Sequence, residues 1–153
     1  AIAEYCAELA PAFGPQARAA RAHARSITAE MHAGFRAVRS ALPMNLGRVN
    51  RPLAAGLEED TLRDIARIDA IWTDTRNRFG AEGPYLFGAT FCNADAAFAP
   101  VVSRFASYAV PCLSDVSHAY MRAVQEHALM REWAADAARE PQDWPLEMYE
   151  SLS

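Results

Sequence analysis

The stretch FCNADAAFAP, residues 91–100, places one acidic residue and one proline inside an apolar run. Its spacing fits a capping box, in which the N3 acid accepts a hydrogen bond from the N-cap backbone N–H and the N-cap side chain accepts one from the N3 N–H. Asp95 takes the N3 position and Cys92 the N-cap position, where a thiol sulfur is a weak acceptor. We therefore expect a helix from about Asn93 to Tyr108, anchored at its start mainly by Asp95.

Apolar residues three or four positions apart predict further helices on both sides of this stretch. The segment 16–42, before Pro43, is expected to form one long amphipathic helix, and residues 58–79 a second. A helix after Ser114, a good N-cap residue, and another over 128–139 complete the set. Alternation typical of strands is missing from the sequence. These patterns predict an all-α fold, an irregular bundle of five helices around one core.

The length and composition of the chain argue against several classes of protein function. A length of 153 residues with 52% hydrophobic residues suits one domain with one core, and a net charge of -4 disfavours nucleic-acid binding. No apolar run approaches the roughly 20 residues of a membrane span, so we expect a cytoplasmic protein without membrane partners. The spacing of the cysteines and histidines predicts no metal site. All 15 basic residues are arginines, which excludes lysine chemistry.

The beginning of the chain predicts a boundary between two units. Residues 1–10 have the pattern of a helix body with no cap before it, and PAFGP, residues 11–15, is typical of a linker. We therefore expect residues 1–10 to be the end of a neighbouring domain and residues 16–153 to be the helical domain. On this interpretation the chain is cut from something longer, or processed.

Four segments, taken in order, resemble the C-terminal helical domain of bacterial glutathione transferases. They are EMHAGFRAVRSALPMN (30–45), DIARIDAIW (64–72), YLFGATFCNADAAFAPVVSRF (85–105) and HALMREWAADA (127–137). The opening AIAEYCAEL resembles the last helix of that family's thioredoxin-like domain. The resemblance implies a homodimeric detoxification enzyme that conjugates glutathione, its co-substrate, to a small electrophile. The glutathione site and the catalytic residues would then lie in the thioredoxin-like domain, and none in this chain.

The arginine-rich segment 16–42 carries the first candidate site residues. Its five arginines stand against the single acid Glu30, and they are interpreted either as a solvated, ion-paired face or as a wall that faces an anion or a second subunit. In the family this helix lines the electrophile cleft and the dimer interface. By position, the cleft candidates are Met31, His32, Phe35 and Arg36. The candidates for the domain junction or partner subunit are Arg18, Arg21 and Arg25.

The central helix carries the remaining candidates. Arg104 matches an arginine that binds a substrate carboxylate in zeta-class, maleylacetoacetate-isomerase-like relatives, and a planar guanidinium suits that role. The alternative for Arg104 is an internal salt bridge with an aspartate of the second helix. Tyr108, one turn on, would offer a hydroxyl to the same cleft.

The family pattern also bears on the cap of the central helix. It has Ser or Thr where Cys92 stands, in the domain interior, so a structural cap is favoured over a reactive thiol. Pro100, two turns in, predicts a kink in this helix. Three functions therefore stay open for the parent protein: a transferase, an isomerase of an acidic substrate, and a non-catalytic helical scaffold.

Overall fold

The computed structural model describes residues 2–51, 53 and 56–141, and its regular elements are helices. In chain order they are α1 (Ile2–Leu9), the 3-10 helix η1 (Pro11–Phe13), α2 (Arg18–Ala33), α3 (Arg36–Ala41), α4 (Glu59–Phe79), α5 (Asn93–Ser107), α6 (Asp115–Glu126) and α7 (Ala128–Ala137). Over these ranges the strand-like pairing is one isolated bridge between Tyr85 and Gly88. The all-α prediction is therefore confirmed for the described residues.

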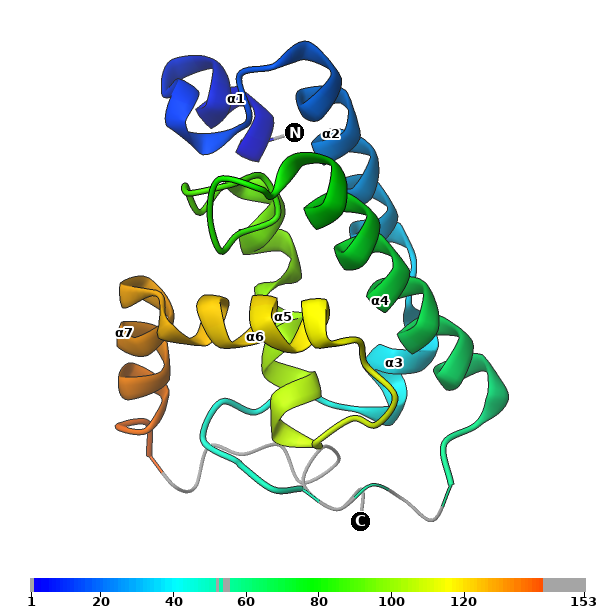
Figure 1. Ribbon diagram of the computed structural model, residues 1–153. Coiled ribbons are helices and arrows are strands. Elements are labelled where there is room, and N and C mark those ends of the chain that lie inside the picture. The colour runs from blue at the N-terminus through cyan, green and yellow to red at the C-terminus, as the bar shows by residue number, and fades with distance from the viewer. Residues whose placement is uncertain (1, 52, 54–55, 142–153) are drawn as a thin grey trace.

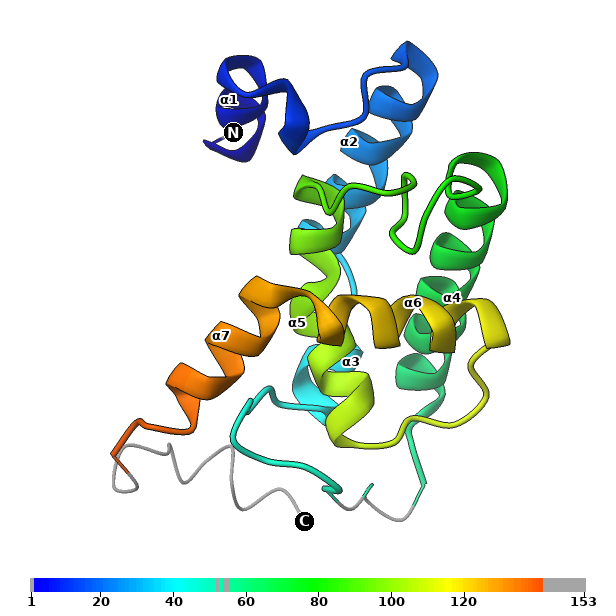
Figure 2. The ribbon, with the colours of Figure 1, turned by 60° about the vertical axis from the view of Figure 1, so that its left-hand side comes forward.

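The helices form a bundle with α5 at its centre. Figure 1 shows α2 and α4 as two long neighbouring helices, and α6 crosses α5. Helix α5 packs against α2 and α6, while α4 also contacts α3 and α6. Figures 1 and 2 both place α1 at one end of the molecule, beside the start of α2. None of the described helices is long and apolar enough to cross a membrane.

An aromatic cluster joins three of these helices in the core. Trp72 of α4 has an exposed fraction of 0%. Its ring centroid lies 5.9 Å from that of Phe98, 5.6 Å from that of Phe105 and 5.1 Å from that of Tyr120. The first two partners belong to α5 and the third to α6. Edge-on and tilted contacts at these distances add to the stabilisation from burial, so the cluster fixes how α5 and α6 sit on α4.

The prediction of one long helix over residues 16–42 is wrong. Helix α2 ends at Ala33, Gly34 is its C-cap, and Phe35 adopts a left-handed backbone with φ 57° before α3 begins. A Cβ at Gly34 would lie 2.8 Å from the Glu30 carbonyl oxygen, so this turn requires glycine. The Phe35 side chain at this break lies in the core, with an exposed fraction of 7%.

The other helices follow the predicted ranges closely. Helices α4 and α5 cover the expected segments, and α5 runs through Pro100 without interruption. The Ser114 side chain caps α6 by accepting a hydrogen bond from the Ser117 N–H at 3.2 Å. Helix α7 differs in its packing, because Leu129 and Trp133 of its predicted apolar face are 64% and 40% exposed. The predicted domain extends to residue 153, and its segment 142–153 lies outside the described residues.

Candidate functional site

The start of α5 is built around the buried carboxylate of Asp95, whose exposed fraction is 0%. Its Oδ2 accepts from the Cys92 N–H at 2.9 Å, and its Oδ1 accepts from the Leu86 N–H at 3.0 Å. Burial raises the pKa of Asp95, while these two hydrogen bonds act in the opposite direction. One side chain therefore caps the helix and also ties the preceding loop to it.

The Cys92 thiol completes the capping box from the N-cap position, where its sulfur faces the Asp95 N–H. The side chain is buried. Burial, and next the charge of Asp95, raise the pKa of Cys92 to about 12. A thiol with that pKa stays protonated near neutral pH, and the thiolate is the nucleophilic form. This environment supports a structural role for Cys92 and argues against a reactive one.

Replacing the thiol by a hydroxyl should strengthen the cap. A serine oxygen accepts hydrogen bonds better than a thiol, so we expect Cys92→Ser to raise the free energy of unfolding by about 0.5 kcal/mol. Urea denaturation followed by circular dichroism measures the change. Cys92→Ala, which offers no acceptor, should show no gain and is the control. A serine variant less stable than the alanine variant would contradict this role for the cap.

The four predicted cleft residues divide between the core and the surface. Met31 and Phe35 are buried in the hydrophobic core. His32 and Arg36 are exposed. Each pair is spaced four residues apart, so Met31 and Phe35 share the apolar face while His32 and Arg36 share the solvent face. The structure therefore does not bring the four side chains into one common environment.

Arg104 is a partly buried cation on α5. Its Nη1 donates to the Pro100 carbonyl oxygen at 3.0 Å, and its buried Nε has no hydrogen-bond partner among the described residues. Burial lowers the pKa of Arg104, and the nearby charge of Arg39 acts in the same direction. Over the part of the chain that the structure describes, no carboxylate pairs with Arg104. The predicted alternative, a salt bridge to an aspartate of the second helix, is therefore wrong.

Tyr108, the C-cap of α5, is tied to the loop that follows α3. The side chain is buried, and its hydroxyl donates to the Pro43 carbonyl oxygen at 3.2 Å. The guanidinium carbon of Arg51 lies 5.2 Å from the centre of its ring, within the range of a cation–π contact. The hydroxyl that was expected to face a cleft is therefore engaged in holding a loop.

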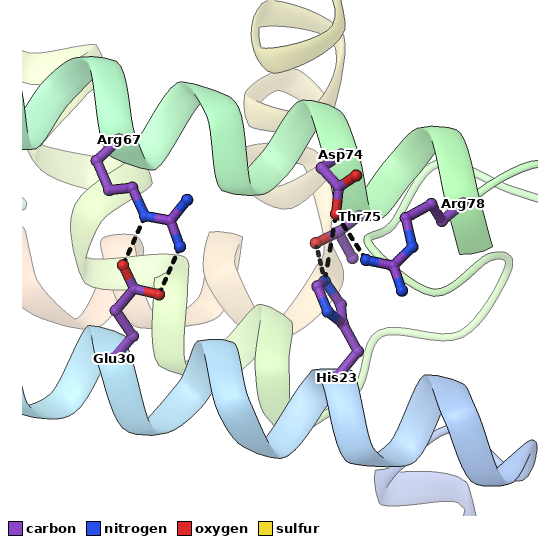
Figure 3. A network of polar contacts seen from close by, with 6 residues as sticks. All are labelled: His23, Glu30, Arg67, Asp74, Thr75 and Arg78. Atoms are coloured by element: carbon purple, nitrogen blue, oxygen red, sulfur yellow. Dashed lines mark hydrogen bonds and ion pairs between the residues drawn. The ribbon is translucent and has the colours of Figure 1, made fainter.

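Two polar clamps that the sequence analysis missed hold α2 against α4 (Figure 3). In the first, Glu30 accepts from Arg67 Nε at 2.7 Å and from Arg67 Nη2 at 2.9 Å. These bonds lower the pKa of Glu30. In the second, His23 Nε2 lies 2.8 Å from Thr75 Oγ1 and 3.9 Å from Asp74 Oδ2. His23 and Glu30 are two helical turns apart, and so are Arg67 and Asp74. This shared spacing could have predicted that the two pairs face each other across α2 and α4.

The second clamp should make stability depend on pH. Burial, and next the charge of Arg78, lower the pKa of His23 in the folded protein. The unfolded chain, with a histidine pKa of about 6.5, then binds the proton more readily. The free energy of unfolding should therefore fall as the pH drops below about 6.5 towards the lowered pKa, and stay reduced below it.

Urea titrations between pH 7.5 and pH 5 test this dependence, and comparison with a variant at position 23 separates His23 from other groups that titrate in the window. The His23→Gln variant should lose less stability over the window than the wild-type protein. Equal losses in both proteins would show that His23 is not the group responsible.

The arginines predicted for an interface lie at the junction of α1, the linker and α2. Arg25 forms an ion pair with Glu4 of α1. Arg21 donates to the Pro15 carbonyl at 3.2 Å and to the Gln16 carbonyl at 2.8 Å. Arg18 is exposed at the start of α2. Two of the three arginines therefore hold the N-terminal segment to the bundle.

The start of α5 reaches the same junction. Asn93 Nδ2 donates to the Ala3 carbonyl oxygen at 2.7 Å. Because Asn93 follows the Cys92 cap directly, the capping box and the junction are parts of one continuous region.

Among the residues with a described position, no group of three or more His, Cys, Asp or Glu could hold a metal ion. A scan against protein-family models matched no family, and a search of curated proteins found no similar sequence.

Proposed function

We propose that this chain is the helical domain of a glutathione transferase. In this proposal a thioredoxin-like domain, of which α1 is the last helix, binds glutathione, and the helical domain holds a small electrophile and contributes to a homodimer. One observation carries the proposal: a buried acid at N3 of the central helix, Asp95, caps that helix and binds the preceding loop. The family pattern has Ser or Thr, two residues and then Asp at this point, and the chain keeps the Asp while Cys92 replaces the Ser or Thr. The order of α1, linker and helical bundle supports it further.

The chemistry assigned to this chain is positioning. A thiolate of glutathione attacks the electrophilic carbon, forms a carbon–sulfur bond and displaces the leaving group. Holding the two reactants together makes the attack effectively unimolecular, which is the contribution expected of a helical domain that supplies one wall of the cleft. The Cys92 thiol, protonated near neutral pH, takes no part in this step.

Conjugation of glutathione to a chlorodinitrobenzene tests the proposal. The protein from the full reading frame that contains this chain should form the conjugate faster than the uncatalysed reaction. The 153-residue chain alone should not. Absence of conjugation by the full protein, with several electrophiles and with circular dichroism that shows a folded protein, would contradict the transferase and favour a helical scaffold.

A glutathione-dependent isomerase of an acidic substrate is the second candidate, and Arg104 favours it. This guanidinium is partly buried, pairs with no carboxylate in the described ranges and has an unbonded Nε. A buried cation without a counter-ion destabilises a fold unless a ligand compensates it. A substrate carboxylate would supply both the missing charge and the missing hydrogen-bond acceptor.

Two arginine variants should shift stability in opposite directions. Arg104→Met removes an uncompensated charge and should raise the free energy of unfolding by about 1 kcal/mol. Arg39→Met should lower it by about 1 kcal/mol, because Arg39 donates to the His32 and Gly34 carbonyls at the end of α2. Both changes are read from urea denaturation. Destabilisation by Arg104→Met would show that the charge is compensated within the folded chain.

A further inference from the structure

A cavity of about 180 Å³ lies where α1, the linker, α2 and the start of α5 meet. Its volume is smaller than that of pockets for drug-sized ligands and suits a small polar molecule. Polar side chains enter it from three helices: Glu4 and Glu8 from α1, Arg21, Arg25 and Thr28 from α2, and Asn93 from α5. Thr28 and Asn93 supply a hydroxyl and an amide oxygen that can bind a ligand.

Two of the four charges in this cavity neutralise each other, and two do not. Glu4 and Arg25 form an ion pair across the junction. Arg21 donates to two backbone carbonyls, which satisfy hydrogen bonds without neutralising its charge. Among the described residues Glu8 has no ion pair or side-chain hydrogen bond. Both side chains are exposed, and among the described residues no opposite charge pairs with either, so the cavity presents one unpaired carboxylate from α1 and one unpaired guanidinium from α2.

We propose that this cavity binds a small zwitterion of the free α-amino-acid class. The ligand's ammonium group would donate to the Glu8 carboxylate, and its carboxylate would accept from Arg21. A simple anion would pair with Arg21 but would be repelled by Glu8. A simple cation would pair with Glu8 but would be repelled by Arg21. A zwitterion would pair with both charges. Hydrogen bonds between charged groups are stronger than those between neutral groups.

The proposal does not depend on the glutathione transferase assignment. The cavity is lined by residues of this chain, and none of them belongs to the glutathione site that the family resemblance implies. Loss of transferase activity in the full protein would leave the zwitterion site in place. Failure of zwitterion binding would likewise say nothing against the transferase.

The test is a titration of the full 153-residue chain with three matched probes, followed by amide chemical shifts in NMR spectra. The probes are L-alanine, propionate, which lacks the ammonium group, and isopropylamine, which lacks the carboxylate. L-alanine should bind with a dissociation constant on the order of 1 mM. Propionate and isopropylamine should each bind at least about tenfold more weakly. The shifts caused by L-alanine should cluster on α1 and the first half of α2.

Charge-removing variants complete the test. Glu8→Gln and Arg21→Gln should each weaken L-alanine binding roughly tenfold. Because Glu8 makes no ion pair or side-chain hydrogen bond within the described ranges, its variant keeps the test valid if Arg21→Gln disturbs the linker. The controls are Arg131→Gln and Glu132→Gln on the exposed surface of α7, which should leave binding unchanged. Binding of propionate as tight as that of L-alanine, or equal binding by Glu8→Gln and wild type, would overturn the proposal.

Discussion

Asp95→Ala should lower the free energy of unfolding by about 3 kcal/mol. The variant removes the acceptor for two backbone N–H groups, those of Leu86 and Cys92, both in hydrogen bonds that the structure buries. Each N–H left without a partner costs its desolvation free energy in addition to the lost bond. A loss of this size is a large fraction of the 5–15 kcal/mol that stabilises a typical domain.

Asp115→Ala is the matched control for Asp95→Ala. Asp115 also lies in the first turn of a helix, α6, but it is exposed and the cap there is Ser114. Removing it should cost less than about 0.5 kcal/mol, the typical size of a helix-dipole contribution. Urea denaturation of the two variants gives the comparison. Similar losses in both would mean that Asp95 acts as an ordinary first-turn acid and that the loop does not depend on it.

Trp72→Ala should lower the free energy of unfolding by about 4 kcal/mol. The indole is fully buried and contacts aromatic rings of α5 and α6 at once, so its loss leaves a large cavity where three helices meet. Its buried Nε1 has no hydrogen-bond partner among the residues that the structure describes, so we expect no hydrogen bond to be lost with the ring. The whole effect is therefore expected to come from packing.

Trp133→Ala provides the comparison for Trp72→Ala, because the same side chain is removed from a surface helix. Trp133 is 40% exposed on α7, and its loss should cost less than about 1 kcal/mol. Far-UV circular dichroism in urea suits both variants, since tryptophan fluorescence changes with the substitution itself. If Trp133→Ala proved as destabilising as Trp72→Ala, the core would extend over α7.

Local patterns were enough to predict most of the helices and one structural site. The apolar period of residues 58–79 predicted α4, because a single stripe of side chains had to be buried. The spacing of Cys92 and Asp95 located the start of α5, because capping joins residues only three positions apart. Helix α6 was located in the same way by its cap residue, Ser114.

Features that depend on tertiary contacts were missed. The apolar spacing continues through Gly34 and Phe35, so periodicity alone could not reveal the helix break at Gly34 and at the left-handed backbone of Phe35. The aspartate pairing considered for Arg104 failed for a similar reason. The sequence alone does not show which side of α5 faces α4. Within the described part of the chain, the Arg104 guanidinium donates only to a backbone carbonyl of its own helix.

Retention of the full-reading-frame protein on immobilised glutathione tests the central proposal most directly. We predict that this protein is retained and is eluted by free glutathione, while the 153-residue chain alone passes through. The Asp95→Ala variant, studied at a temperature where it stays folded, should still be retained, because its defect is one of stability. A full protein that is folded, is not retained and does not compete for free glutathione in solution would contradict the assignment of this chain to a glutathione transferase.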